Sequence, residues 1–279
     1  MKENFLIRSK PFLRFLAVIA GVSLISAGRD DDKSSRTLRV LCYNIHWALG
    51  TDGVYDVERL AKVIAATKPD LVALQEVDVG VKRSGRVHEL RRLSELTGLA
   101  SRFGPTQHYE GGLFGNAVLT RFPILDVAIH PLPYTESTKE LVTYPRGAIL
   151  VTVEGPGGKP LRFISTHFQH NVAEDRVAEA NAVNKLFAKD DKDRIPTILA
   201  GDMNATPEAE PIQVLLKEWT NAIDDEAAPS APSKNPQSRI DYIFYRPAPR
   251  FRLIETKVIP EEVASDHRPV LAVFELLSP

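Results

Sequence analysis

Cysteine is almost absent from this sequence of 279 residues, and the apolar run near its N-terminus is short. Cys42 is the single cysteine, so an intramolecular disulfide is excluded, and cysteine usage does not indicate the redox compartment. Residues 15–28 are apolar, but as a helix they would reach about 21 Å at ~1.5 Å per residue, which is short of the ~30 Å hydrocarbon core of a bilayer. The run therefore favours a targeting segment over a membrane-spanning helix.

The residues around this run have the layout of a secretory signal. Four basic residues precede it, Arg29 and three aspartates follow it, and residues 26–28 are small enough for a cleavage site. We expect residues 1–28 to be a signal peptide, residues 29–279 to be the mature domain, and the protein to be secreted or periplasmic. If the segment is not cleaved, it would act as a membrane anchor.

A surplus of positive charge is also lacking. The formal net charge is −1, and removal of residues 1–28, which carry four basic residues and one acidic residue, leaves the mature chain near −4. Such a chain lacks the electrostatic footprint of a protein that grips a long polyanion. Only short basic clusters remain. Lys82-Arg83 with Arg86 lies in a loop close to Glu76 and could reach a substrate phosphate, whereas Arg91-Arg92 lies on a predicted helix face.

Predicted strands and helices alternate along the mature chain, and no internal repeat is visible. Apolar runs predict strands at 38–43, 70–75, 117–120, 148–153, 161–165, 197–201, 240–245, 252–258 and 270–275. Helices are expected after Asp56, over 87–96, over 173–189 and from Thr206-Pro207, with a surface loop over 227–237. The Gly155–Gly158 stretch indicates a hairpin turn. Hairpins mixed with helices favour one α/β domain with mainly antiparallel sheets and outer helices.

Polar side chains gather where these strands end. Six such segments carry carboxylates, carboxamides or histidines: Tyr43–His46, Leu74–Val77, Thr166–Phe168, Gly201–Asn204, Arg239–Tyr242 and Ser265–Pro269. Hydrolysis of a phosphate ester needs these types of side chain. A hard divalent ion prefers oxygen ligands, a water molecule needs a positioned base, and the developing charge on phosphorus needs donors.

Each segment taken alone has a structural explanation. Asn44, Asp202 and Asn204 suit turns, Glu76 suits a salt bridge, and a lone histidine such as His167 suits a rim or core position. Asp241 would serve as a strand-edge charge, and Ser265–His267 as a turn ended by Pro269. The context of His46 and His170 is weaker still. The joint pattern of six polar strand ends in one domain is what favours an active site.

At this point the sequence resembles the endonuclease/exonuclease/phosphatase family, which includes deoxyribonucleases, abasic-site endonucleases, sphingomyelinases and inositol-polyphosphate phosphatases. The matching segments span residues 37–277 and are Tyr43-Asn44, Gln75–Val77, Gly115–Ala117, Ser165–His167, Gly201–Asn204, Asp241-Tyr242 and Ser265–Pro269. Each segment is a weak motif, but the full set in this order is specific. The resemblance implies a four-layer α/β/β/α sandwich, in which two packed, mixed, mainly antiparallel sheets carry outer helices.

The resemblance also implies residue roles. Glu76 would be the main Mg²⁺ ligand, with Asn44 and Asp266 nearby, and Mn²⁺ would substitute for Mg²⁺. His267, oriented by Asp241, would be the catalytic histidine at the scissile phosphate, and Asp202 would position or deprotonate the attacking water. Further phosphate contacts would come from Asn204, His167 and Asn116.

The expected activity is water attack at the phosphorus of a phosphate ester, with a small or lipid-linked substrate favoured. Two alternatives stay open, a secreted non-specific endonuclease and a catalytically inactive binding module with the same fold. Nucleic acid is not the favoured partner because of the charge balance, and no protein partner is implied. No catalytic glutamate, aspartate or histidine of the pattern is missing, which favours the enzyme.

Overall fold

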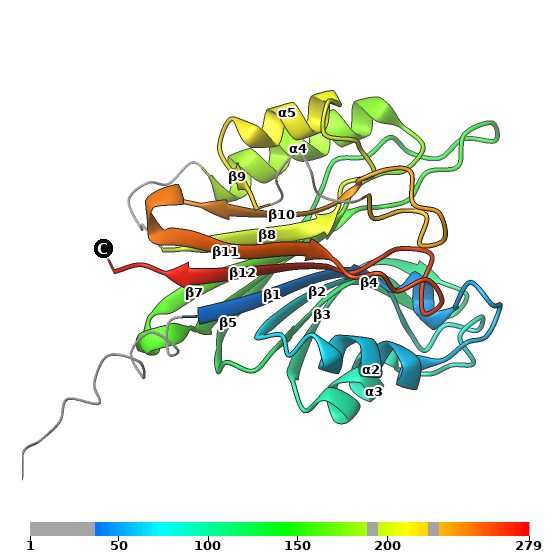
Figure 1. Cartoon of the computed structure of the whole chain (residues 1–279). Helices are drawn as coiled ribbons and strands as arrows, with labels where there is room; N and C mark the ends of the chain where they lie inside the picture. Colours follow the sequence, from blue (N-terminus) through cyan, green and yellow to red (C-terminus); the bar gives the residue numbers. More distant parts are fainter. Residues whose placement is uncertain (1–36, 189–194, 223–228, 279) are drawn as a thin grey trace, which may run out of the picture.

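The computed structural model describes residues 37–188, 195–222 and 229–278, which form two six-stranded sheets (Figure 1). The predicted signal segment, residues 1–28, lies outside these residues. In strand order the first sheet comprises β11 (Phe251–Val258), β12 (Val270–Leu276), β1 (Thr37–Asn44), β2 (Leu71–Val79), β4 (Gly112–Thr120) and β3 (Ala100–Tyr109). The second comprises β5 (Ile124–Pro131), β6 (Gly147–Glu154), β7 (Pro160–His167), β8 (Thr197–Asp202), β10 (Asp241–Arg246) and β9 (Thr220–Asn221).

Both sheets are mixed and mainly antiparallel, as predicted. The parallel pairs are β1 with β2 in the first sheet and β7 with β8 in the second. The predicted hairpin joins β6 to β7, and its turn contains Gly157 with φ of 74°. Where two strands run parallel, their carboxyl ends meet at one edge, so residues that follow different strands come together there.

Four layers result from the packing (Figure 1). One apolar cluster lies between the sheets and joins β1 and β2 residues to β6, β7 and β8 residues, for example Val40 and Ala73 with Ile149, Phe163 and Ile198. A second cluster buries α2 (Val57–Ala66) and α3 (Glu89–Thr97) against the first sheet, and a third buries α4 (Ala173–Phe187) and α5 (Glu210–Leu216) against the second. The predicted α/β/β/α sandwich is confirmed.

Two helix termini follow the expected chemistry. The Asp56 side chain caps α2 by accepting a 2.8 Å hydrogen bond from the Arg59 amide, which satisfies one of the free N–H groups of the first turn. Gly98 ends α3 in the left-handed conformation, with φ of 73°. The predicted start of α3 at Val87 is two residues early, since His88 is the N-cap and its Nδ1 accepts from the Arg91 amide.

One prediction around the second sheet is wrong, and another holds only in part. The helix expected from Thr206-Pro207 is α5, which begins at Glu210, because residues 206–209 form a turn closed by the Ala209 amide on the Thr206 carbonyl and Pro211 is the first-turn proline. The expected surface loop is at the surface in part: Pro232, Lys234, Asn235 and Gln237 are exposed, whereas Ser230 and Ser233 are fully buried. Their hydrogen bonds reach the backbone of Asp241 and Asp266, so this loop supports two of the predicted site residues.

Three strands were not predicted. β3 contains Gly104 and Pro105 and is mostly polar, β5 is a partly exposed edge strand, and β9 has two residues. Such segments lack the continuous or alternating apolar pattern by which strands are recognised. Among the described residues, no helix is long and apolar enough to span a membrane.

Candidate active site

Strand register places three of the predicted residues in one row. His167, the last residue of β7, pairs with Asp202, the last residue of β8, and Asp202 pairs in turn with Asp241, the first residue of β10. Residues paired across neighbouring strands point to the same face of a sheet. All three are buried, with 5%, 1% and 0% of their surfaces exposed. The end of the second sheet therefore presents two carboxylates and an imidazole side by side.

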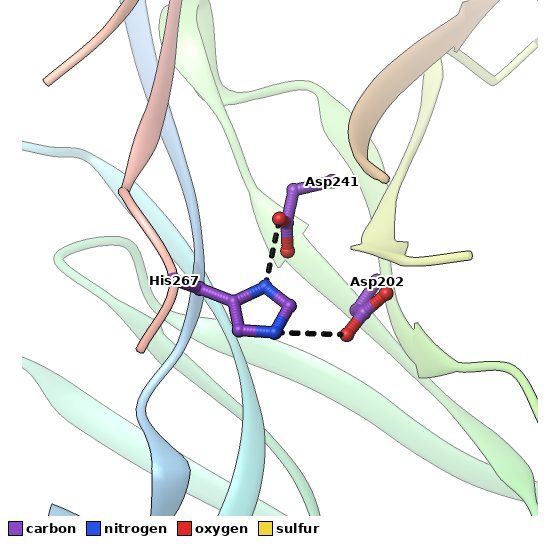
Figure 2. Close-up of side chains that lie close together, drawn as sticks. All are labelled: Asp202, Asp241 and His267. Atoms are coloured by element: carbon purple, nitrogen blue, oxygen red, sulfur yellow. Dashed lines mark hydrogen bonds and ion pairs between the residues drawn. The ribbon is translucent and has the colours of Figure 1, made fainter. Parts of the chain in front are cut away.

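His267 joins this row from the loop that precedes β12 in the first sheet (Figure 2). Its Nδ1 lies 2.9 Å from Asp241 Oδ2, and its Nε2 lies 3.7 Å from Asp202 Oδ2. The imidazole is thus fixed on one side by a hydrogen bond and faces a second carboxylate on the other. Asp241 Oδ1 is buried and has no hydrogen-bond partner among the described residues, so this carboxylate can accept one more hydrogen bond.

The charges of this group depend on one another. Burial alone would lower the pKa of His267, but the carboxylates of Asp241 and Asp202 outweigh it and hold the pKa well above the usual range. Burial, followed by the charge of Asp241, raises the pKa of Asp202 above the usual carboxyl range. For His167, burial and the nearby Arg146 guanidinium lower the pKa, so this ring is neutral at ordinary pH.

Asn44 connects the two sheets. Its Nδ2 donates to Glu76 Oε1 at 3.0 Å and to Asp202 Oδ2 at 3.1 Å, so one buried amide holds a carboxylate from each sheet. Glu76 sits where the pairing of β2 with β4 shifts register, and it has φ of 58°. A left-handed glutamate in a strand is strained, and strain of this kind is concentrated at functional sites. Because of this register shift, Glu76 falls outside the regular alternation of side chains between the two faces of β2.

The remaining predicted residues differ in their placement. Asn204 Nδ2 lies 3.0 Å from His167 Nε2 and donates to the Phe168 carbonyl, so Asn204 belongs to the same group. The side chain of Asp266 is 46% exposed, with Oδ1 3.7 Å from His46 Nδ1, and Ser265 Oγ links it to the Asn44 carbonyl. Asn116 is buried and donates to the Gly147 carbonyl at 2.8 Å.

A cavity of about 160 Å³ adjoins this group. Glu76 and His167 lie on its wall together with residues that the sequence did not single out for the site, chiefly Arg146, Tyr144 and Gln107. Arg146 is only 6% exposed, and its Nη1 lies 3.1 Å from His167 Nδ1. The one local signal for it was an arginine placed directly before an apolar strand. Its burial comes from α4 and β7, which are distant in sequence.

Arg146 forms no salt bridge with a carboxylate among the described residues, and its Nε has no hydrogen-bond partner there. A buried cation without a carboxylate is costly unless an anion completes it. Its position against His167 therefore leaves it able to bind an anion. Sequence reasoning missed this residue because surface arginines also occur directly before apolar strands, so that one signal did not set it apart.

The residues present fit a divalent cation. The Glu76 carboxylate lies 3.0 Å from the Asn44 amide nitrogen, and the side-chain oxygen of Asn44 accepts from the His46 backbone amide at 3.1 Å. Oxygen donors of this kind suit Mg²⁺. Ligand atoms of Asp202, Asp241 and His267 also lie within 4.8 Å of one another. Both sets contain an internal hydrogen bond, Asp241 with His267 and Asn44 with Glu76, and Glu76 is the one of these residues that lies on the cavity wall.

The endonuclease/exonuclease/phosphatase family model matches residues 41–267. The chain belongs to this family. A family member from Beutenbergia cavernae DSM 12333 is 28% identical, with 86% of this chain and 72% of that chain covered at a TM-score of 0.71. A mannosyl-6-phosphatase from Bacteroides thetaiotaomicron VPI-5482 is 20% identical over 86% and 100% of the two chains, with a TM-score of 0.70. The human Nocturnin catalytic domain is 22% identical over 87% and 95%, with a TM-score of 0.65.

Membership fixes the general chemistry. Proteins of this family are typically hydrolytic phosphoesterases and generally depend on a divalent metal. The last two likenesses are under 25% identity and bear on the fold alone.

A buried glutamate behind the cavity makes protein stability depend on pH. Burial raises the pKa of Glu179 to about 8, and its Oε2 accepts a 2.9 Å hydrogen bond from the Gln169 amide. The folded pKa exceeds the unfolded value, so the folded state binds more protons between pH ~4.5 and ~8, and stability falls as pH rises through that window. The contribution is on the order of 1 kcal/mol per pH unit.

We expect Glu179→Gln to remove this slope. Glutamine keeps an oxygen acceptor for Gln169 and carries no charge, so the variant should unfold at higher urea than the wild type at pH 8 and at a similar concentration at pH 5. Urea denaturation at the two pH values measures the difference. The matched control is Glu174→Gln, an exposed glutamate on the same helix. Parallel pH dependence of Glu179→Gln and wild type would show that Glu179 is ionised in the folded protein.

Proposed function

We propose that this protein is a Mg²⁺-dependent hydrolase of phosphate esters that directs water at phosphorus and prefers small or lipid-linked substrates to duplex DNA. The observation that carries the proposal is His267 held between the carboxylates of Asp241 and Asp202, beside the Asn44–Glu76 pair. These groups come from both sheets and converge at one end of the sandwich. Family membership supports the general reaction.

The chain's own residues divide the work by their hydrogen bonds. Asp241 occupies Nδ1 of His267, so Nε2 is left to donate to a phosphate or leaving-group oxygen. Asp202 is acceptor-only when ionised, and its Oδ2 lies within 4 Å of both His167 and His267, where it can orient and deprotonate a water molecule. His167 at the end of β7 and Asn204 just after β8 then contact the phosphate, and Arg146 supplies the buried positive charge.

Glu76 and Asn44 would hold the divalent ion, with Asp266 from the neighbouring loop as the predicted third residue. When bound, the ion neutralises negative charge on the phosphate and its leaving oxygen. Asn116 stays a predicted phosphate contact. In this structure its side-chain amide donates to the Gly147 carbonyl instead.

The substrate preference is tested with a panel of esters. Duplex binding depends on many Lys and Arg contacts to phosphate, and the mature chain, with a net charge near −4, has no surplus of basic residues. We expect higher kcat/KM for small phosphomonoesters, small phosphodiesters or phospholipids than for duplex DNA at moderate salt, with Mg²⁺ or Mn²⁺. A preference for DNA that declines steeply with salt would instead support the non-specific endonuclease. Absence of turnover on every ester would support the inactive binding module.

The location of the protein is a separate proposal. The basic and then apolar N-terminus supports export, with residues 29–279 as the mature domain. N-terminal sequencing of protein from its native host should begin near Arg29. Intact Met1 on cytosolic protein would contradict export, and intact Met1 in the membrane fraction would indicate the anchor.

A further inference from the structure

We propose that Ser230 is a positioning residue that sets the geometry of the Asp241–His267 pair. This inference rests on the proposed function and adds a residue on which the reaction depends. The pair spans both sheets, because Asp241 begins β10 in the second sheet and His267 lies in the loop before β12 in the first (Figure 2). Its hydrogen bond, 2.9 Å from Nδ1 to Oδ2, therefore depends on where two separate backbones are held.

The two backbones are held in different ways. Asp241 is paired with Asp202 in the regular ladder of β10 and β8. His267 lies outside the strands, in the connection 259–269 between β11 and β12, and its own amide donates to Ser265 Oγ at 3.3 Å. Groups that react together have to be held within about 0.5 Å of their productive geometry. The loop that carries His267 therefore needs support from outside its own sheet.

Ser230 is hydrogen-bonded to both sides of the pair. Its Oγ accepts from the backbone amides of Ile240 and Asp241, each at 3.2 Å. Its carbonyl accepts from the backbone amide of Arg268, the residue directly after His267, at 2.7 Å. The start of β10 and the loop that carries His267 are thus joined through the atoms of one residue.

The rest of the segment fixes the flanks of His267. The Ser233 amide donates to the Asp266 carbonyl at 2.6 Å, and the Ser233 carbonyl accepts from Arg268 Nε at 2.7 Å. Both neighbours of His267 in the sequence are therefore hydrogen-bonded to the segment that contains Ser230.

The position of Ser230 is itself fixed locally. Its amide donates to the Ser238 carbonyl at 2.9 Å, beside an antiparallel bridge between Ala231 and Ser238. Ser230 is also fully buried, so it lies away from the substrate and its hydrogen bonds are shielded from water. These contacts make Ser230 a fixed reference point for both members of the pair.

The hydroxyl of Ser230 is the part that a substitution can test. A hydroxyl oxygen has two acceptor lone pairs, and here two amides use them. Without the hydroxyl, the buried amides of Ile240 and Asp241 lose their acceptor, which is unfavourable unless the start of β10 shifts. A shift of this backbone moves Asp241 Oδ2 relative to His267 Nδ1.

Kinetics give the first test. In saturating Mg²⁺ we expect Ser230→Ala to lower kcat on an aryl phosphate ester by about 10–100-fold, since a misplacement of ~1 Å can cost that much. KM and the Mg²⁺ concentration for half-maximal rate should stay close to wild type, because Ser230 contacts neither substrate nor metal ligand side chains. Ser230→Thr keeps the hydroxyl and should restore most of the activity. The matched control is Ser238→Ala, which removes a hydroxyl of the same segment that has no hydrogen bond among the described residues.

A spectroscopic readout separates positioning from stability. In protein with ¹⁵N-labelled histidine, the Nδ1–H proton of His267 is the signal that disappears in His267→Gln. We expect Ser230→Ala to move this signal upfield and to speed its exchange with water, because the hydrogen bond to Asp241 becomes longer. Ser230→Thr and Ser238→Ala should leave it in place. A residue that only stabilised the fold would lower the urea midpoint and leave this signal of the folded protein unchanged.

A double substitution tests whether Ser230 acts through the histidine. In the His267→Gln background, we expect Ser230→Ala to lower the residual kcat by less than about twofold, because residues that act through one another are not additive. The same fold loss in both backgrounds would overturn the inference.

The remaining outcomes distinguish this inference from the proposed function. If Ser230→Ala does not fold, Ser230→Cys gives the same tests, because a thiol occupies the site but is a weak acceptor. If ester hydrolysis requires His267 but the Ser230 variants change neither kcat nor the Nδ1–H signal, the inference fails alone. If no ester is hydrolysed yet the signal depends on the Ser230 hydroxyl, the proposed function fails and the positioning role stands.

Discussion

We expect His267→Ala to lower kcat/KM for phosphate-ester hydrolysis by about 10²–10⁴-fold, the usual worth of a principal acid–base or transition-state donor. Nδ1 of this ring is hydrogen-bonded to Asp241, and Nε2 faces Asp202 and is the atom that we propose donates to the reacting phosphate. No neighbouring residue can replace it, because burial and Arg146 keep His167 neutral. Steady-state rates on an aryl phosphate ester with Mg²⁺ measure the effect.

The controls for this prediction separate chemistry from folding. His267→Gln keeps most of the volume and can still donate to the buried Asp241, so it should fold like wild type and be as inactive as His267→Ala. Asp241→Asn should cost less than either substitution, since Asp241 orients the ring without touching substrate. His108→Ala removes an exposed histidine of β3 and should retain wild-type activity. Near wild-type turnover by both His267 variants would show that this residue is not part of the reaction.

The second large effect concerns the divalent ion. We expect excess chelator to abolish hydrolysis, and added Mg²⁺ or Mn²⁺ to restore it, because the Glu76 carboxylate, with the Asn44 amide beside it, offers the oxygen ligands that Mg²⁺ prefers. Glu76→Ala should lose about 10²-fold or more in kcat/KM, since several kcal/mol of charge stabilisation depend on the ion. The Asn44 amide keeps its hydrogen bond to Asp202 in this variant, so the fold should persist.

Backbone conformation provides a sharp control for Glu76. Its φ of 58° is unfavourable for every residue except glycine, at a cost of roughly 1–2 kcal/mol. Glu76→Gly should therefore be at least as stable to urea as Glu76→Ala, yet equally inactive. Such a result separates the loss of the carboxylate from any loss of stability. Full activity in excess chelator, or of Glu76→Gly, would exclude the metal role.

Much of the site could be predicted because its residues follow apolar strands. Asn44, His167, Asp202 and Asp241 occupy strand ends that the sequence marks clearly, and register alone brings the last three together. His267 joins them since β12 pairs with β1, which places the loop before β12 beside Asn44. The alternation of strands, helices and hairpins predicted one α/β domain with mainly antiparallel sheets and outer helices, and the four-layer α/β/β/α order came from the family resemblance.

The rest depended on contacts that no local pattern encodes. The burial of Arg146 and the aromatic surroundings of Arg83 are made by segments far apart in the chain, including Trp47 and Tyr109. The irregularity that gives Glu76 a positive φ is visible only in how β2 pairs with β4. The start of α5 was misplaced because Thr206-Pro207 and Ala209–Pro211 both resemble a helix start, and a hydrogen-bonded turn occupies the first of them.

The central claim is that this site directs water at the phosphorus of an ester, and hydrolysis in ¹⁸O-labelled water tests it most directly. With Mg²⁺ and an aryl phosphate ester, mass spectrometry of the wild-type products should find one ¹⁸O in the phosphate product and none in the alcohol. Product formation should disappear in chelator and in His267→Gln. Label in the alcohol, or unlabelled phosphate product, or a rate that His267→Gln shares with wild type, would contradict the account.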